Sequence, residues 1–236
     1  MNFTAEQRAA FRTAARDLER IDTAVYETFD KDPLEPIIGM GEPHLPIGFF
    51  GRDPGREEVR HGTPFIGSGG QKLRATLHEF HHGSAMPDFD ASLAIGRAYF
   101  WANTVPYKPV GNNAWSMAAK KRFQPLMAEV LVRNWQGREL ITLGREAFLW
   151  FGIGRPRDER QALEAFWQRA DRFEASTEVT VALADGTTER FRLHPLPHPS
   201  PLNATWYRHF PALLRNRLER LHTPSDTGRA AGSLLL

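Results

Sequence analysis

The chain has 236 residues, of which 25% are charged and 41% hydrophobic, and its formal net charge is only +2. This length fits one globular domain with a substantial core, while so small a net charge does not by itself indicate a nucleic-acid partner. The absence of cysteine excludes disulfides, thiolate catalysis and cysteine-ligated iron–sulfur or zinc sites. No apolar run approaches membrane-spanning length and the N-terminus lacks a signal-peptide core, so we expect an intracellular, cytoplasmic protein without a membrane partner.

The first part of the chain predicts a helix, a loop and then a buried strand. Apolar residues at helical spacing indicate a helix over 5–21, whereas 32–46 is rich in proline and glycine. The apolar run 47–50 predicts a strand that ends in a turn containing Asp53. Open α/β sheets bind ligands at the carboxyl ends of their strands, although aspartate is also common in ordinary turns.

A glycine-rich segment precedes the next predicted helix. Ser68 and Gln71 match a capping box with Ser68 as the N-cap, and the helix should continue to about residue 80. The free backbone N–H groups at its start suit an anion. Turn formation explains the glycines of this segment equally well.

The rest of the chain alternates strands and helices. Strands are predicted over 98–105, 139–143, 178–183 and 188–196, and helices over 120–135, 145–151, 157–173 and 206–221. The pattern predicts an α/β fold, a three-layer α/β/α domain with a central, mostly parallel four-stranded sheet. We expect a single domain over 1–221 and a flexible C-terminal tail over 222–236.

Four short motifs follow one another in a fixed order. Asp53-Pro follows the first strand, Pro-Phe65 lies in the next loop, Asn103 lies near the end of the second strand, and His198-Pro-Ser-Pro-Leu202 follows the last. In this order they resemble the uracil-DNA glycosylase superfamily over roughly 47–221. The last motif is the most specific of the four.

The resemblance implies a monofunctional uracil-DNA glycosylase that flips uracil out of DNA and hydrolyses its N-glycosidic bond, the first step of base excision repair. The sugar becomes cationic in the transition state and uracil leaves as an anion, so catalysis needs negative charge near the sugar and a donor at the uracil O2. Asp53 fits the first role and His198, as a neutral imidazole, the second. His194 lies within a strand and lacks the Ser-Pro-Leu continuation, so we expect an ordinary surface or core residue there.

The resemblance also assigns the base and the DNA backbone. Asn103 would pair with O4 and N3–H of uracil, Phe65 would stack on the flipped base, and Leu202 would wedge into the duplex. An asparagine that closes a strand and a core aromatic are the ordinary alternatives for the first two. The expected substrate-binding residues are Gly51, Arg52, Gly55, Phe65 and Asn103, and the expected DNA-binding residues are Ser68, Gln71, Lys72, Lys108, Ser200 and Leu202. Arg74 is a further candidate for a phosphate contact, although an ordinary surface charge is the favoured explanation for Arg74 as it is for Lys72 and Lys108.

Two departures from the superfamily's patterns make the chain look like a hybrid. The loop 55–71 most resembles family 4, which usually carries a four-iron four-sulfur cluster, usually with Glu at position 52 and Ala at position 53. Without cysteines we expect no metal and no cofactor, with packing around the helix that begins near Lys120 in place of the cluster. The final motif resembles family 1, whose tyrosine at the position of Gly55 excludes the 5-methyl group of thymine. Discrimination at the uracil 5-position should therefore be relaxed.

Two other functions remain open from the sequence. One is a non-catalytic binder of uracil-containing or damaged DNA, against which Asp53 and His198 argue. The other is a glycosylase for hypoxanthine or xanthine, against which Asn103 argues. No lysine occupies a motif position, so a Schiff-base lyase step is not expected. The expected partner is uracil-containing DNA, and the expected state is a monomer.

Overall fold

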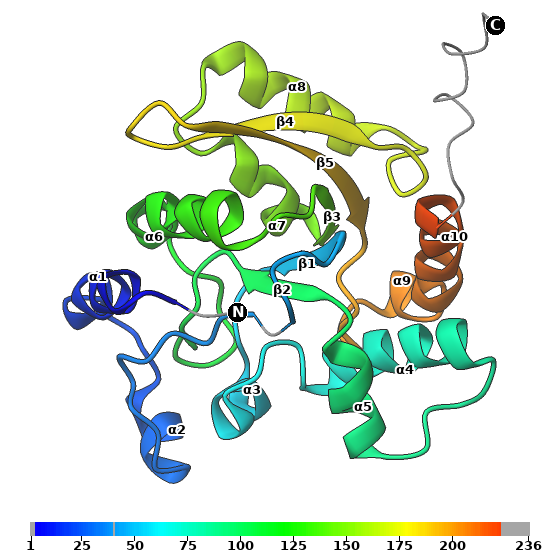
Figure 1. The fold of residues 1–236 in the computed structure, drawn as a ribbon, viewed down its shortest axis with the longest axis horizontal. Helices are drawn as coiled ribbons and strands as arrows, with labels where there is room; N and C mark the ends of the chain where they lie inside the picture. Colours follow the sequence, from blue (N-terminus) through cyan, green and yellow to red (C-terminus); the bar gives the residue numbers. More distant parts are fainter. Residues whose placement is uncertain (1–2, 40, 223–236) are drawn as a thin grey trace, which may run out of the picture.

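The central sheet has five strands in the order β2-β1-β3-β5-β4, seen in a computed structural model that describes residues 3–39 and 41–222 (Figure 1). The strands β1, β2, β3 and β5 are parallel, and β4 pairs antiparallel with β5. Their bounds are Ile47–Gly51 for β1, Phe100–Asn103 for β2, Glu139–Leu143 for β3, Thr177–Ala182 for β4 and Thr188–Leu196 for β5. The predicted α/β class and mostly parallel sheet are confirmed. The predicted number of four strands is wrong, because both arms of the hairpin join the sheet and β4 forms its edge.

Helices cover both faces of this sheet (Figure 1). One face packs against α1 (Ala5–Arg16), α6 (Met117–Glu129), α7 (Arg145–Leu149) and α8 (Arg157–Gln168). The other packs against α4 (Ser68–His82), α5 (Phe89–Gly96) and α10 (Phe210–His222). The shorter elements are α2 (Thr23–Thr28), α3 (Arg56–His61), the π-helix η1 (Val130–Asn134), the 3₁₀-helix η2 (Trp150–Gly152) and α9 (Ala204–Tyr207).

Alternation along the strands divides the core into two layers. The neighbours Phe49 and Phe50 are both fully buried but belong to different apolar clusters, because successive side chains of a strand point to opposite faces. Leu140 and Ile141 divide in the same way. The central strands are therefore apolar on both faces, as expected for a parallel sheet covered by helices on each side.

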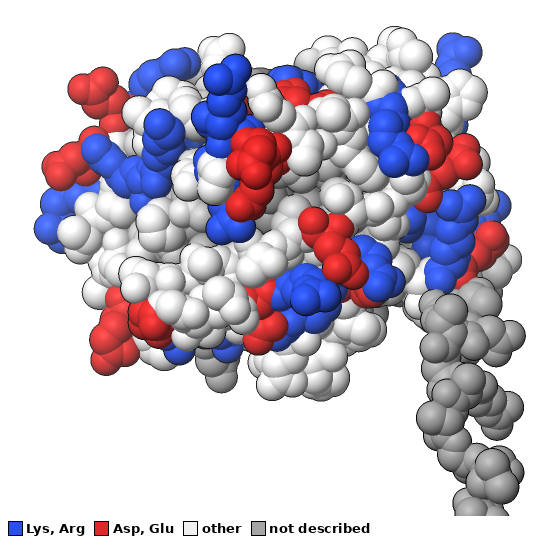
Figure 2. All heavy atoms as spheres, turned by 90° about the horizontal axis from the view of Figure 1, so that it is seen from above, with Lys and Arg blue, Asp and Glu red and all other residues white. Residues whose placement is uncertain are grey.

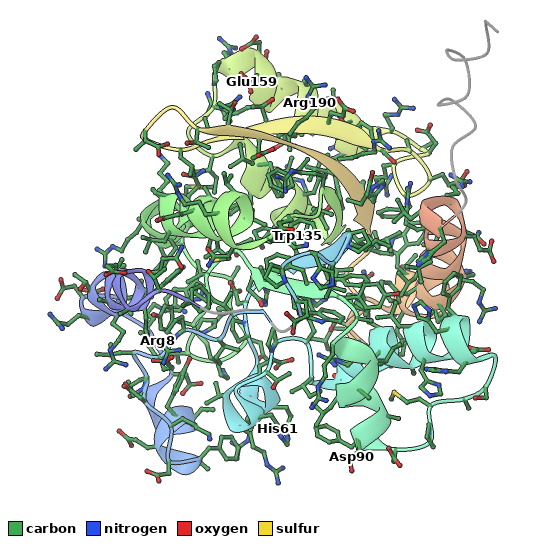
Figure 3. The ribbon with its side chains drawn as sticks, in the orientation of Figure 1. Arg8, His61, Asp90, Trp135, Glu159 and Arg190 are labelled. Atoms are coloured by element: carbon green, nitrogen blue, oxygen red, sulfur yellow. The ribbon has the colours of Figure 1, made fainter. Side chains whose placement is uncertain are left out.

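Trp135 anchors one face of the sheet. It follows η1, and its ring stacks on Phe100 of β2 and on Phe191 of β5 at centroid distances of 4.7 and 5.9 Å (Figure 3). Its indole N–H donates to the Leu45 carbonyl at 2.6 Å, just before β1. This one side chain thus connects the segment before β3 to β2, to β5 and to the residues that lead into β1.

Several boundaries differ from those predicted. The first helix ends at Arg16 rather than near residue 21, because Arg20 adopts a left-handed φ of 75° and Ile21 forms a β-bridge with Pro109. The short helices α2, α3 and α5 were not predicted, and the helix predicted over 206–221 is divided into α9 and α10. Apart from His222, the predicted tail lies outside the described residues. Within the described ranges, no helix has the length and apolarity needed to cross a bilayer.

Candidate functional site

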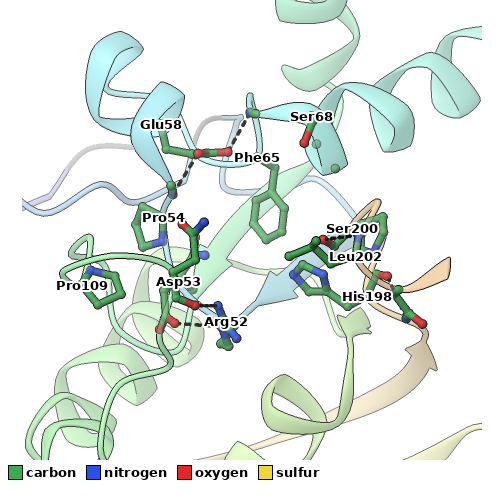
Figure 4. A pocket seen from close by; sticks show the side chains of 18 of the residues that line it. Arg52, Asp53, Pro54, Glu58, Phe65, Ser68, Pro109, His198, Ser200 and Leu202 are labelled. Atoms are coloured by element: carbon green, nitrogen blue, oxygen red, sulfur yellow. Dashed lines mark hydrogen bonds and ion pairs between the residues drawn. The ribbon is translucent and has the colours of Figure 1, made fainter. Parts of the chain in front are cut away.

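A cavity of about 600 Å³ lies at the carboxyl edge of the parallel strands, and we call it the strand-end cavity. Its walls come from the segments that follow β1, β2 and β5 and from the start of α4 (Figure 4). This is the edge at which open parallel sheets bind ligands. The predicted site residues that line it are Arg52, Asp53, Gly55, Phe65, Ser68, Asn103, His198, Ser200 and Leu202.

The side chain of Asp53 is 2% exposed, yet neither of its carboxylate oxygens accepts a hydrogen bond from the described residues. Arg52 Nε lies 2.9 Å from Oδ2, an ion pair without the angle of a hydrogen bond. Burial raises the pKa of Asp53 to about 7, the charge of Glu146 adds to this, and the charges of Arg52 and Lys120 oppose it. An aspartate that only closes a turn would bond to nearby backbone N–H groups. This carboxylate instead keeps its acceptor positions open.

Backbone contacts hold the end of β1 in place. Thr104 Oγ1 donates to the Arg52 carbonyl at 2.5 Å, and Thr104 N–H donates to the Gly51 carbonyl at 2.9 Å. Arg52 Nη2 donates to the Asn112 carbonyl at 2.9 Å, which connects the β1 turn to the loop after β2. The position of Asp53 is therefore fixed by the two strands between which its turn lies.

His198 is open to the strand-end cavity, and no described residue hydrogen-bonds to its ring nitrogens. Its exposed surface faces a concave wall, so the surrounding protein still desolvates the ring. This desolvation and the charge of Arg52 lower the pKa of His198 to about 4, against a smaller opposing effect of Glu146. The ring is therefore neutral near pH 7. Gly144 adopts a left-handed φ of 89°, and a Cβ there would lie 3.2 Å from that of His198.

Asn103 ends β2 directly beside Gly51 of β1. The residue is 3% exposed and lines the cavity, and its Oδ1 is buried without a hydrogen-bond partner among residues 3–39 and 41–222. A buried amide oxygen normally has a partner, because an unsatisfied one costs about 1–3 kcal/mol. This geometry leaves an acceptor ready for a ligand that carries an N–H group.

Phe65 projects from the loop before α4 toward the space between Arg52 and His198 (Figure 4). Its backbone has a left-handed φ of 56°, which is uncommon for a residue with a side chain. Arg74 Nε donates a hydrogen bond to the Phe65 carbonyl at 2.7 Å. The Phe65 ring covers Gly51, where a Cβ would lie 2.4 Å from the ring carbon Cζ. The ring also packs against Trp101 at 5.3 Å. The predicted Gly51 thus acts beneath Phe65 rather than in the wall of the cavity.

Glu58 organises the loop between β1 and α4, and the sequence analysis missed it. Its buried carboxylate accepts hydrogen bonds from the N–H groups of Gly55, Ile66 and Gly67 at 2.9, 2.9 and 2.8 Å (Figure 4). A Cβ on Gly55 would lie 2.7 Å from Glu58 Oε2. A side chain at this position would therefore displace the Glu58 carboxylate before it could reach the cavity.

The start of α4 differs from the predicted capping box. Gly67 is the N-cap, Ser68 is the first helical residue, and Gln71 Nε2 donates to the Ile66 carbonyl instead of completing a box. Residues 67–70 line the cavity, so the free N–H groups of this first turn face it. Lys72 Nζ lies 4.1 Å from the centre of the Tyr207 ring and thereby connects α4 to α9.

Two basic residues predicted as DNA contacts lie in the interior. Lys108 is 4% exposed, and its ammonium group donates to Asp22 and to the carbonyls of Pro109 and Gly111. Arg74 is fully buried among backbone carbonyls. The prediction that Lys108 contacts DNA is wrong, because internal acceptors already satisfy its ammonium group. Arg74 is neither a phosphate contact nor a surface charge for the same reason.

The loop after β5 carries the remaining predicted residues. Ser200 Oγ accepts from the Leu202 N–H at 3.2 Å, and Asn203 Nδ2 donates to the His198 carbonyl at 3.2 Å. Leu202 is 90% exposed, unlike most large apolar side chains of the described residues. By contrast, His194 is buried, with Nε2 2.6 Å from Glu139 and Nδ1 2.8 Å from Ser176, so that of the two ordinary roles expected for it the structure shows the core residue.

The residues present do not fit an iron–sulfur cluster or a bound metal. The chain contains no cysteine, and the described residues contain no group of three or more His, Asp or Glu side chains placed to hold a metal. The segment around α6 is instead packed by aromatic rings. Phe123 stacks on Phe11 of α1 and packs against Tyr107, with centroid distances of 6.3 and 5.4 Å.

The carboxyl edge of this three-layer α/β/α domain thus brings together an open carboxylate, a neutral imidazole and an amide oxygen that has no partner among the described residues. The chain belongs to the uracil DNA glycosylase superfamily, whose family model matches residues 38–222. Comparison with curated proteins gave no match. Membership assigns the chain to the DNA glycosylases, enzymes of DNA repair that hydrolyse N-glycosidic bonds, and makes DNA its partner.

Proposed function

We propose that the protein is a monofunctional uracil-DNA glycosylase that works inside the cell as a monomer. The observation that carries this proposal is the buried Asp53 carboxylate, which lacks hydrogen-bond partners among the described residues and shares a cavity with the neutral ring of His198. Burying a carboxylate whose single ion pair in the described part of the chain is with Arg52 is costly, and such arrangements are concentrated at functional sites. A ligand and an attacking water would supply the missing partners.

Asp53 would act on the sugar side of the scissile bond. Above its pKa of about 7 the carboxylate orients or deprotonates the attacking water and stabilises the cationic sugar. Water adds to C1′, the C1′–N1 bond breaks, and its electron pair leaves with uracil. No covalent enzyme intermediate is needed, in keeping with a monofunctional enzyme.

His198 would act on the leaving base. Because its pKa is about 4, the ring is neutral at neutral pH and donates a hydrogen bond to the uracil O2 instead of a proton. Negative charge develops on this oxygen in the transition state, so the bond strengthens as the reaction proceeds.

Asn103 and Phe65 would select and hold the base. The unpaired Oδ1 of Asn103 accepts N3–H of uracil while its amide group donates to O4. Cytosine presents the opposite pattern and would be rejected. Phe65 provides a ring for stacking, Ser68 and Ser200 lie where DNA phosphates would approach, and the exposed Leu202 would fill the space that the flipped base leaves.

The direct test is incubation with an oligonucleotide that contains one uracil, followed by alkali to cleave abasic sites. We expect cleavage by the wild type and its loss in Asp53→Asn and His198→Ala, with DNA binding retained. Asp90→Asn, on the surface of α5 (Figure 3), and the exposed His44→Ala are matched controls that should keep full activity. Tight binding of uracil DNA without any excision would instead support a non-catalytic binder.

Substrate choice is tested in the same assay. The cavity of about 600 Å³ has no aromatic wall at Gly55, so hypoxanthine, xanthine and 5-substituted uracils are the competing substrates. Asn103→Asp should weaken selection of uracil over cytosine, since one mispaired contact in a desolvated site costs about 1–3 kcal/mol. Unchanged uracil excision by this variant would contradict the role given to Asn103.

A further inference from the structure

A second hollow of about 900 Å³ lies between α6, α7 and α8, and we call it the α6–α8 groove. Figure 2 looks onto the molecule from the side of α8, and basic and acidic side chains are mixed across that face. The groove differs from this mixed surface. Among the described residues, its wall contains six basic side chains and two acidic ones: Lys120, Lys121, Arg145, Arg155, Arg157 and Arg160, against Glu146 and Glu164.

Half of these cations are already neutralised by neighbours. Lys120 pairs with Glu146, Arg145 with Glu164, and Arg155 with Glu159. The other three are exposed and form no ion pair within 3–39 and 41–222: Lys121, Arg157 and Arg160. Free cations around a hollow favour a polyanion, because both acidic groups of the wall are paired already.

The wall of the groove also contains apolar side chains, among them Leu149 and Ile153. Met117 at the rim is 54% exposed. Cations around apolar surface suit a nucleic-acid strand, whose phosphates are anionic and whose bases and sugars are not.

The groove and the strand-end cavity lie back to back across the start of α7. Glu146 lines the groove, and its charge acts on both Asp53 and His198 of the cavity. Gly144, immediately before α7, closely approaches His198. Both α6 and α7 begin at the carboxyl edge of the sheet, after β2 and β3 respectively. The two hollows therefore share the start of α7 as a common boundary.

We propose that the α6–α8 groove binds the phosphate backbone of the DNA strand that continues beyond the flipped nucleotide. The inference requires that the chain acts on DNA, as its superfamily does, but not that uracil is its substrate. An acidic protein segment is the competing occupant, and the test separates the two.

The test is fluorescence anisotropy with uracil-free single strands of about 6 and about 30 nucleotides, lengths that bracket the roughly 4–16 nucleotides of single binding sites. The groove variant carries Lys121→Gln, Arg157→Gln and Arg160→Gln. The matched control carries Arg16→Gln, Lys31→Gln and Arg97→Gln, which are exposed, lie outside the groove and also form no ion pairs with the described residues. Each triple variant changes the formal net charge from +2 to −1, by loss of three positive charges.

The groove variant should bind the long strand on the order of 10- to 100-fold more weakly, and its slope of log affinity against log salt should fall by about 2. Its affinity for the short strand should match that of the control. Equal losses in the two triple variants, or equal losses on both lengths, would overturn the proposal, as would lost binding of polyglutamate with unchanged binding of DNA. A length-dependent loss in a protein without uracil excision would leave the groove assigned and the proposed function wrong.

Discussion

The two ends of the strand-end cavity are built differently. At the β1 end, the side chain of Asp53 is 2% exposed and its turn is tied to β2 by Thr104. At the β5 end, His198 is open to the cavity and Leu202 is 90% exposed. The hydrogen bonds of Ser200 and Asn203 there join residues of the same loop.

The difference separates two tasks. Burial at the β1 end raises the pKa of Asp53 and makes the ionised carboxylate unfavourable, which suits a group that waits for a cationic sugar. Exposure at the β5 end suits side chains that must contact a large partner. In the proposed function, one end would therefore fix the chemistry and the other would meet the DNA.

The largest expected effect comes from Asp53→Asn, which breaks the β1 end chemically. We expect a loss of about 10²–10³ in kcat, since one group that stabilises transition-state charge is typically worth this much. Stability should change in the opposite direction. The raised pKa means that the folded protein holds a proton that the unfolded chain loses between pH 3.8 and about 7, so wild-type stability falls as pH rises through this window.

The asparagine variant lacks this dependence. Above pH 7 its free energy of unfolding, measured by denaturant titration, should exceed that of the wild type by up to about 4 kcal/mol. This is the free-energy equivalent of moving the pKa from 3.8 to about 7. Below pH 4 the difference should vanish. A variant that is inactive and also less stable at pH 8 would show that Asp53 has a structural role instead.

The pH profile sharpens the comparison next. Activity that needs ionised Asp53 and neutral His198 should decrease about tenfold for each pH unit below about 7, because Asp53 becomes protonated. His198 adds no limb in this range, since its ring is already neutral above pH about 4. Arg52→Gln removes a cation that lowers both pKa values. The rising limb of kcat/KM should therefore move to higher pH, while Arg56→Gln on the exposed side of α3 leaves it in place. A limb that stays at the same pH in Arg52→Gln would separate Asp53 from the titration.

Glu58→Gln tests how rigid the β1 end must be. Three backbone N–H groups donate to the two carboxylate oxygens of Glu58, whereas an amide group has only one acceptor oxygen. At least one of these N–H groups would therefore lose its partner. We expect the free energy of unfolding to fall by about 1–3 kcal/mol. KM should rise, because residues 55–67 become more mobile around the cavity. Glu57→Gln, on the same helix and with 41% of its side chain exposed, is the control and should change stability little. Equal stability of the two variants would show that the Glu58 contacts are dispensable.

The sequence predicts most of what depends on neighbours along the chain. The bounds of β3 and β5 match those predicted, because each is an apolar run bordered by turn residues, and Asp53, Asn103 and His198 follow strands whose parallel order brings their ends together. Lys108 could not be assigned correctly, because its burial depends on Asp22, which lies 86 positions earlier.

Glu58 and Phe65 show the same limit. Glu58 accepts from Gly55 three residues earlier, a local helix-start contact, but its bonds to Ile66 and Gly67 reach eight and nine residues along the chain, and nothing in local propensity indicates these. The left-handed backbone of Phe65 is uncommon for a residue with a side chain and depends on Arg74 and on Gly70, where a Cβ would lie 2.0 Å from the Phe65 carbonyl oxygen. Tertiary contacts, not local pattern, therefore complete the cavity.

The smallest expected effect concerns the β5 end. Leu202→Ala should leave folding stability within about 0.5 kcal/mol of the wild type, since a side chain that is 90% exposed contributes little to the folded core. In a duplex the side chain would become buried where the base leaves, and burial of a leucine is worth roughly 1.5–3 kcal/mol. Alanine keeps part of this, so excision from duplex DNA should fall on the order of tenfold, or about 1.4 kcal/mol. Single-stranded substrate has no stacked partner to replace, and its excision should change much less. Leu202→Met, which keeps the apolar length, should restore duplex activity. An equal loss on both substrates would place Leu202 in the binding of the strand itself, and the division of tasks between the two ends would then be wrong.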